Sequence, residues 1–263
     1  MTTEQATDVS PRDIHWPAPR SFCRAQLIAG LLKRRHGGTF VDAGCGDGYM
    51  SERLARIGMH GTAIDASPEA IHLTQTRIST RRIEGVEVLQ GDIFDARVEE
   101  GAADVVTFLE VLEHLDDDIA ALNRLRHLLK PDGLLVLSVP AHEDLWDELD
   151  EWAGHVRRYE RDELIDKLKS TGWKPLRVYN YGFPLINLTR KLRALFYSRL
   201  SRKHATESKR DATLRSGVHP DGYVSGLGWL WTAYGFAASV LQRPFLGTDW
   251  GEGYLVLARR NDV

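Results

Sequence analysis

The chain has 263 residues, of which 43% are hydrophobic and 27% charged, which suffices for one large domain or for a domain with a cap. Its formal net charge of −3 excludes a global basic field, so we expect no nucleic acid partner. Its two cysteines do not indicate a disulfide framework. Residues 1–15 lack the apolar core of a signal peptide, and we expect them to form a disordered tail on a cytoplasmic protein.

The first expected elements are a helix, a short strand and a glycine-rich turn. Apolar residues recur at near-helical spacing across Arg20–Arg35, and the apolar run Thr39–Val41 follows. That run leads into Asp42-Ala43-Gly44-Cys45-Gly46-Asp47-Gly48, which opens the helical pattern from Met50. Glycines at such a turn bring bare backbone against a ligand. Their G-x-G-x-G spacing differs from the G-x-G-x-x-G of dinucleotide-binding proteins, which disfavours an NAD-dependent reductase.

Alternating strand and helix patterns follow, and they predict a parallel sheet. Asp65 ends one predicted strand, where a carboxylate can accept both ribose hydroxyls of an adenosine. Asp92 follows the next strand, and residues 182–252 form a connection too long to be an empty loop. The later strands are expected at residues 62–65, 86–90, 104–108, 134–139, 174–181 and 254–258.

The glycine-rich turn and the two aspartates stand in the order found in class I S-adenosylmethionine-dependent methyltransferases, which the chain resembles over about residues 38–180. The resemblance implies a Rossmann-like α/β fold with a seven-stranded, mostly parallel sheet and an antiparallel strand seven. It implies one domain over residues 16–181 and 253–263, with 182–252 as a helical insertion between strands six and seven. The residues expected to bind S-adenosylmethionine are Asp42, Gly44, Cys45, Gly46, Asp65, Ala66, Asp92, Ile93, Leu109 and Arg20, with Arg24 as the alternative arginine.

Two interpretations of the insertion remain open. The first is a helical cap that walls the acceptor pocket. The second is a basic amphipathic helix across residues 185–203 that makes peripheral contact with an anionic membrane, since residues 182–221 carry nine Lys/Arg against three Asp/Glu. The uncharged stretch Gly222–Gln242 holds four glycines, so we do not expect a spanning helix.

Two segments carry the candidate catalytic groups, because both follow strands whose carboxyl ends border the ligand site of an open α/β sheet. In Glu110-Val111-Leu112-Glu113-His114, helical spacing would put the two glutamates and the histidine on one face. In Gly154-His155-Val156-Arg157-Arg158-Tyr159, the histidine can act as a general base near neutral pH. The candidate catalytic residues are His155, Glu110 and Tyr159, with His142 as the alternative base.

Both segments also resemble ubiquinone-pathway O-methyltransferases and small-RNA 2′-O-methyltransferases. In those relatives an E-x-x-E-H motif binds a divalent metal that polarises the acceptor hydroxyls. The resemblance therefore implies a metal as an alternative to a free base, and its ligands would be Glu110, Glu113, His114 and His155.

The leading hypothesis is O-methylation of a small-molecule or lipid-like acceptor. One alternative is C- or N-methylation of an apolar acceptor, for which His155 could be structural. Another is a nucleotide- or RNA-binding module without turnover. The intact acidic and glycine residues argue against lost cofactor binding, and the absence of a basic surplus argues against RNA.

Overall fold

The computed structural model describes residues 17–94, 97–190 and 228–261. Its strands are β1 (Thr39–Ala43), β2 (His60–Asp65), β3 (Val86–Gln90), β4 (Ala103–Leu109), β5 (Leu129–Pro140), β6 (Trp173–Tyr181) and β7 (Gly253–Arg260). Its helices are α1 (Pro19–Leu32), α2 (Tyr49–Arg56), α3 (Pro68–Thr80), α4 (Asp118–Leu128), α5 (Glu148–Ala153), α6 (Arg161–Ser170) and α9 (Gly228–Leu241). The short 3₁₀ helices are η2 (Leu112–His114), η3 (Glu143–Leu145) and η4 (Arg243–Phe245).

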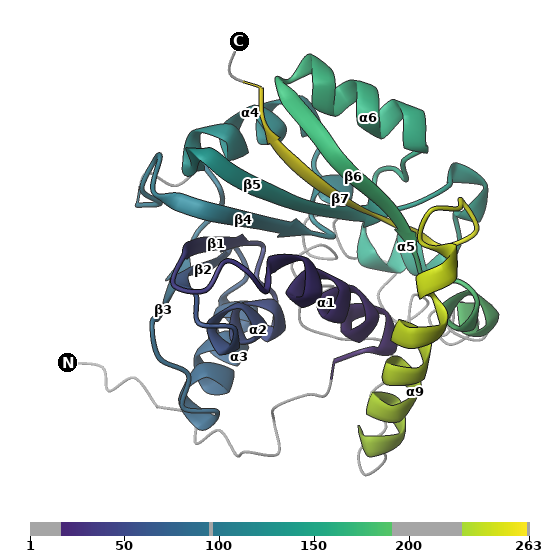
Figure 1. Ribbon diagram of the computed structural model, residues 1–263, viewed down its shortest axis with the longest axis horizontal. Helices are drawn as coiled ribbons and strands as arrows, with labels where there is room; N and C mark the ends of the chain where they lie inside the picture. Colours follow the sequence, from purple (N-terminus) through teal and green to yellow (C-terminus); the bar gives the residue numbers. More distant parts are fainter. Residues whose placement is uncertain (1–16, 95–96, 191–227, 262–263) are drawn as a thin grey trace.

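All seven strands join one sheet in the order β3-β2-β1-β4-β5-β7-β6 (Figure 1). Strand β7 runs antiparallel to both β5 and β6, and the other neighbours are parallel. The predicted α/β class with an antiparallel seventh strand is therefore confirmed. Strand β5 starts earlier than predicted, because residues 130–133 lie within it beside a register shift against β4.

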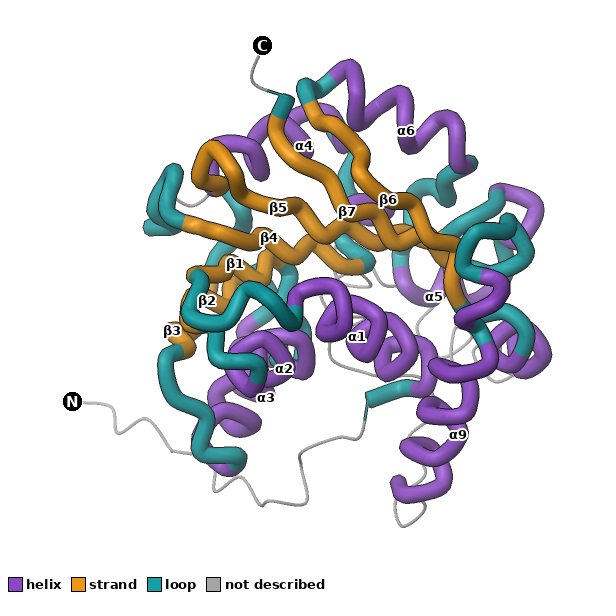
Figure 2. Tube along the Cα trace, in the orientation of Figure 1, coloured by secondary structure: helices purple, strands orange, loops and turns teal. Residues whose placement is uncertain are grey.

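Helices cover both faces of the sheet, as expected when successive strands connect through crossovers. Helices α1, α2 and α3 lie on one face, and α4 and α6 lie on the other (Figure 2). Each face has its own apolar core, and Val105 and Val106 point into different ones because side chains alternate along a strand. The central strands β4 and β5 are buried on both faces, as their nearly continuous apolar sequences predict.

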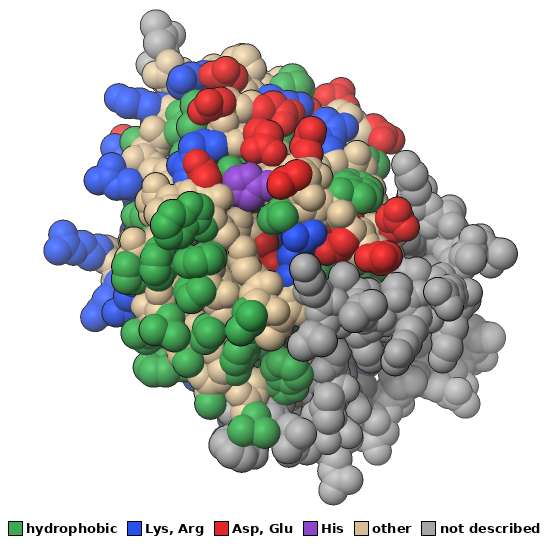
Figure 3. Space-filling view, turned by 90° about the vertical axis from the view of Figure 1, so that its right-hand side faces the viewer, with side chains coloured by type: hydrophobic (Ala, Val, Ile, Leu, Met, Phe, Trp, Pro, Cys, Tyr) green, Lys and Arg blue, Asp and Glu red, His purple; other side chains and the backbone are tan. Residues whose placement is uncertain are grey.

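The described part of the insertion packs against the N-terminal helix. Gly235 of α9 lies against Phe22 of α1, and the Cys23 thiol donates to the Gly235 carbonyl at 3.3 Å. The outer face of α9 is apolar and solvent-exposed (Figure 3), and its large exposed side chains are Leu230, Phe236, Val240 and Leu241. Among the described helices, none has the length and apolar character needed to cross a membrane.

Some sequence predictions concern residues outside the described ranges. The predicted tail at 1–15 and most of the basic helix at 185–203 belong to this group. Arg190 is described, and its Nε atom ion-pairs with Asp147 at 3.0 Å. Peripheral membrane contact through 185–203 stays a prediction.

Candidate active site

The glycine-rich turn between β1 and α2 depends on left-handed backbone and close packing. Gly44 has φ +72°, and a Cβ atom there would lie 2.3 Å from Cγ2 of Val111. Gly48 has φ +75° and forms the N-cap of α2, where a Cβ would lie 2.8 Å from the Thr74 side chain. Glycine fits both positions because it tolerates positive φ and leaves the space of a side chain free.

The side chain of Asp42 holds the start of this turn in place through two hydrogen bonds. Its Oδ1 accepts from the Thr107 hydroxyl and its Oδ2 from the Ser51 hydroxyl, both at 2.6 Å. The side chain is buried, and burial raises the pKa of Asp42. The carboxylate therefore ties the end of β1 to β4 and α2, although the residue also borders the neighbouring cavity.

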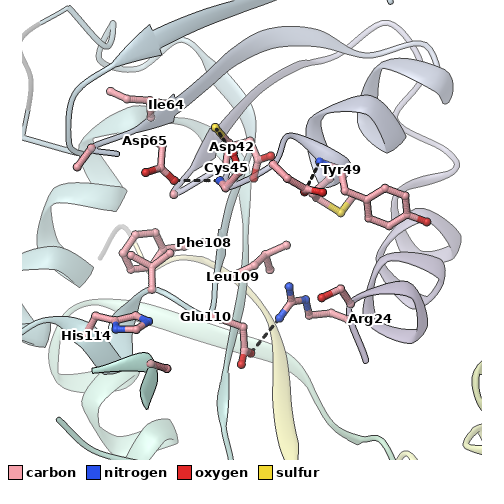
Figure 4. Close-up of a pocket in the computed structure, with 18 of the residues that line it drawn as sticks. Arg24, Asp42, Cys45, Tyr49, Ile64, Asp65, Phe108, Leu109, Glu110 and His114 are labelled. Atoms are coloured by element: carbon pink, nitrogen blue, oxygen red, sulfur yellow. Dashed lines mark hydrogen bonds and ion pairs between the residues drawn. The ribbon is translucent and has the colours of Figure 1, made fainter. Parts of the chain in front are cut away.

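A cavity of about 400 Å³ lies beyond the ends of β1, β2 and β4. Figure 4 shows Asp65 and Cys45 on one side of it and Glu110 and His114 on the other. The residues predicted to bind the cofactor all line this cavity: Asp42, Gly44, Cys45, Gly46, Asp65, Ala66, Asp92, Ile93, Leu109 and Arg20.

Asp65 is held in a fixed orientation at the end of β2. Its Oδ2 accepts from the Gly46 backbone N–H at 2.9 Å, and its Oδ1 accepts from the Ser67 N–H at 2.8 Å. Burial raises the pKa of this carboxyl group. A carboxylate offers about four acceptor sites, so this group can still accept hydrogen bonds from hydroxyl groups of a ligand.

Glu110 faces helix α1. Its Oε2 lies 2.5 Å from Nη1 of Arg20, and its Oε1 lies 3.1 Å from Nη1 of Arg24. Oε1 also accepts from the hydroxyls of Ser138 at 2.9 Å and Tyr181 at 3.1 Å. Burial alone would raise the pKa of Glu110, but the two arginine charges outweigh it and lower the pKa to about 2. Glu110 is thus an ionised anchor for both candidate arginines.

The expected helical turn across residues 110–114 is wrong at its first residue. Glu110 has φ +59°, and only Leu112–His114 form a 3₁₀ turn. This change of backbone direction separates Glu110 from the other predicted metal ligands. Glu113, His114 and His155 each offer one ligand atom within 4.8 Å of the others, and Glu110 lies outside this group.

The chemistry of these three side chains suits a cation. Glu113 is fully buried, and neither of its carboxyl oxygens has a hydrogen-bond partner in the described part of the chain. Burial and the charge of Glu110 raise the pKa of Glu113 well above its ordinary value. Burial and the neighbouring His155 lower the pKa of His114 to about 3, so its imidazole is neutral. A buried carboxyl without a partner is costly unless a proton or a cation balances it.

His155 is paired with Asp150 of α5, a residue that the sequence did not single out. The Nδ1 atom of His155 lies 2.7 Å from Oδ1 of Asp150, and its Nε2 lies 3.9 Å from Oε1 of Glu113. The side chain of His155 is 11% exposed and lines the cavity. Next to it, α5 contributes an apolar wall of Leu149, Trp152 and Ala153.

Two other candidate residues lie away from the cavity. Tyr159 is fully buried, and its hydroxyl donates to Asp118 at 3.1 Å, so the predicted catalytic role is corrected to one in the core. Burial and the Asp118 charge raise the pKa of Tyr159. His142 turns toward Glu160, with its Nδ1 3.3 Å from Oε2 of Glu160. It therefore does not provide the alternative base.

The described residues of the insertion do not line this cavity. Their link to the cavity is indirect: Glu252 ion-pairs with the cavity residue Arg20 at 3.3 Å. Tyr181, the last residue of β6 before the insertion, contacts Glu110. The prediction that the insertion walls the acceptor pocket stays a prediction for residues outside the described ranges.

Comparisons with known proteins agree with this geometry. The family described as methyltransferase domain matches residues 19–178. The chain is 37% identical over 108 residues to a ubiquinone biosynthesis O-methyltransferase of Xanthomonas campestris pv. campestris (strain B100), a match that covers 39% of this chain and 43% of the relative. The match thus spans less than half of that curated relative.

Two solved structures share the fold at low identity. A geranyl diphosphate methyltransferase in complex with SAM aligns with a TM-score of 0.58 at 17% identity, covering 91% of this chain and 85% of that one. The cyclase SpnF aligns with a TM-score of 0.55 at 17% identity, covering 89% of this chain and 80% of that one. One fold thus serves methyl transfer and ring formation, so the reaction has to be argued from the site.

Proposed function

Because the chain belongs to the methyltransferase domain family, we propose that it transfers the methyl group of S-adenosylmethionine to a hydroxyl group of a small, apolar or lipid-like acceptor. One observation carries the proposal. A single cavity is lined by the whole predicted cofactor set and by His155, which Asp150 contacts from behind and which stands beside the apolar wall of α5.

The cofactor end offers the groups that an adenosine and a methionine need. Asp65 can accept hydrogen bonds from the ribose hydroxyls, and Asp92, which the family resemblance places at the adenine amino group, lines the same cavity. Arg20 and Arg24 supply positive charge where the family resemblance places the methionine carboxylate. Ion pairing with Glu110 holds both arginines in place before any ligand arrives.

The acceptor end suits a hydroxyl on an apolar body. Leu149 and Trp152 give an apolar surface, and His155 stands next to it. Among the described residues that line the cavity, the only arginines or lysines are the two that Glu110 holds, so an anionic acceptor would lack a cation near His155. Methyl transfer from a sulfonium needs an aligned acceptor and, for a hydroxyl, removal of one proton. His155 can take that proton at its Nε2 atom.

A divalent metal is the alternative to a free base. The residues present fit one, since Glu113 has unpartnered oxygens and His114 is neutral. Glu113, His114 and His155 would hold the ion, which would lower the pKa of the acceptor hydroxyl. In that case His155 would bind the ion through the same Nε2 atom.

The test uses labelled S-adenosylmethionine and a series of phenols and catechols with alkyl or prenyl chains, because these acceptors join a hydroxyl group to an apolar body that suits the wall of Leu149 and Trp152. We expect His155→Ala to lower kcat about 10²–10⁴-fold, with unchanged affinity for S-adenosylhomocysteine. His142→Ala is the matched control, since His142 lies outside the cavity and faces Glu160, and it should keep activity. With a metal, a chelator should abolish turnover and an added divalent ion should restore it.

Full activity in His155→Ala, together with resistance to a chelator, would contradict both mechanisms. Catalysis would then rest on the alignment of donor and acceptor alone. Methylation of amines or carbon acceptors only, with no loss in His155→Ala, would point to N- or C-methyl transfer instead.

A further inference from the structure

Asp150 lies behind His155 with its carboxylate fully buried. Its Oδ1 lies 2.7 Å from Nδ1 of His155, and Arg158 donates to both carboxylate oxygens at 2.9 to 3.0 Å. We infer that Asp150 is a positioning residue, which fixes the orientation and the tautomer of His155 so that Nε2 keeps its lone pair for the cavity. This inference rests on the proposed function, in which His155 acts on the acceptor.

The backbone reinforces this side-chain pair. Helix α5 ends at Ala153, and the φ of +77° at its C-cap, Gly154, lets the chain turn back. The His155 N–H then donates to the Asp150 carbonyl at 3.0 Å, so backbone and side chain of His155 are tied to the same residue. The next residue, Val156, donates its N–H to the Glu113 carbonyl at 2.9 Å, which holds the segment against η2.

Asp150 is in turn held from the other side. Arg158 uses Nη1 to donate to the Ala141 carbonyl at 2.9 Å, directly after β5. The Asp147 N–H donates to Oδ2 of Asp150 at 3.0 Å as part of the capping box of α5. Ring contact with His114, with centroids 4.7 Å apart, limits rotation of the His155 imidazole. The pair is therefore built into the end of the sheet.

The chemistry of the carboxylate decides the tautomer. The Arg158 guanidinium donates to both oxygens of the buried carboxylate, and this charge-assisted pairing keeps the group ionised. An ionised carboxylate only accepts hydrogen bonds, so the His155 proton must sit on Nδ1. A neutral imidazole has one such proton, and Nε2 is left with its lone pair.

The same arrangement serves either mechanism of the proposed function. A general base needs the bare Nε2 to accept the acceptor proton. A metal ligand needs the same lone pair, and a carboxylate behind the opposite ring nitrogen is the common way to orient a ligating histidine. Asp150 thus matters whether or not a metal binds to His155.

Asp150→Asn tests the inference. An asparagine side chain has one acceptor oxygen, and the charged Arg158 would donate its hydrogen bonds to that oxygen. The amide NH₂ group would then face Nδ1 of His155, which favours the tautomer with the proton on Nε2. Nitrogen-15 NMR, with the His155 signals assigned by their loss in His155→Gln, should show this exchange of tautomers. We expect kcat for methyl transfer to fall about 10²-fold, with acceptor KM and S-adenosylhomocysteine affinity near the wild-type values.

Glu151→Gln is the matched control, because Glu151 is the next residue on α5, is exposed and carries the same charge. It should keep the wild-type tautomer and kcat. Asp150→Glu retains a carboxylate and should keep the proton on Nδ1 and recover part of the rate. Thermal melts of all variants identify any that fail to fold.

Two results would overturn the inference: wild-type His155 protonated on Nε2, or the same tautomer in wild type and folded Asp150→Asn. If no acceptor were methylated by the wild type, the proposed function would fail while the NMR comparison still decided the tautomer. If His155→Ala were fully active while Asp150→Asn changed the His155 tautomer as expected, the positioning role of Asp150 would be supported. The role of His155 as general base would then be refuted.

Discussion

Gly44 offers a quantitative test of why the cofactor turn needs glycine. A Cβ-bearing residue in the left-handed region costs about 1–2 kcal/mol. The new Cβ would also lie 2.3 Å from Cγ2 of Val111, far inside the roughly 3.5–4.0 Å at which carbon atoms make favourable contact. Overpacking of this kind typically costs about 1–3 kcal/mol. We therefore expect Gly44→Ala to lower the free energy of unfolding by about 2–5 kcal/mol.

A double-mutant cycle separates the two contributions. Val111→Ala removes the colliding methyl group, so the double variant should recover about 1–3 kcal/mol relative to the sum of the single changes. Gly101→Ala is the matched control, since Gly101 has φ +67° and a Cβ added there would meet no atom of the described residues within 4 Å. Gly101→Ala should lower the free energy of unfolding only by the cost of the left-handed backbone, about 1–2 kcal/mol, and its effect should not depend on Val111.

The assay is urea unfolding followed by two optical probes, with calorimetry of S-adenosylhomocysteine binding on the same samples. If Gly44→Ala cost no more than Gly101→Ala, and if its effect simply added to that of Val111→Ala, the close approach of Val111 would not be the reason for glycine at this position.

Two further predictions concern single carboxylates. Asp65→Ala should weaken S-adenosylhomocysteine binding by about 1–3 kcal/mol because ribose hydroxyls lose their acceptor, and calorimetry showing wild-type affinity would refute the ribose assignment. Asp104 accepts from the Thr39 N–H at 2.8 Å and pairs with Lys130 at 2.9 Å; burial would raise its pKa, but these partners lower it from 3.8 to about 2. Its contribution to stability is therefore complete above pH 4 and is lost as pH falls toward 2. The free energies of unfolding of wild type and Asp104→Asn, measured over this range, should come closer together as the pH falls. A difference that stays constant with pH would contradict this link between protonation and stability.

The sheet and the cofactor turn could be predicted because their signals are local. Short apolar runs bounded by glycines and acidic residues indicate the strands. The order of the motifs along the chain predicts how these strands are connected in the sheet. The predicted strand at Val86–Gln90 has the same bounds in the structure, and the other strand predictions overlap the observed ones. The positions of Asp65 and Asp92 follow from their places at the ends of these strands, since Asp65 is the last residue of β2 and Asp92 comes two residues after β3.

The catalytic arrangement was harder to predict because it depends on backbone turns and long-range pairing. Helical spacing grouped Glu110 with His114, but the positive φ of Glu110 turns its side chain toward α1. The pairing of Asp150 with His155 requires the left-handed turn at Gly154, and nothing in the acidic run around Asp150 singles out that residue. The hydrogen bond from Tyr181 to Glu110 could not be predicted either, because it depends on where β6 joins the sheet.

The placement of β7 has a consequence for the order in which the protein folds during synthesis. Strand β7 is the last of the seven to leave the ribosome, yet it lies between β5 and β6. Until it arrives, β6 has no partner within the sheet, and β5 exposes an open edge. The half of the sheet from β3 to β5 can assemble earlier, because each of its strands pairs with one already made or soon to follow.

The insertion makes this final step slower. Closing the 71-residue connection, residues 182–252, costs about 1.7 kcal/mol more chain entropy than closing a ten-residue hairpin loop. Tyr181 and Glu252 stand at the two ends of this connection, and both contact the Glu110–Arg20 pair. The charged wall of the cofactor cavity is therefore completed only when β7 enters the sheet, so a nascent chain halted before that step would hold an unfinished site.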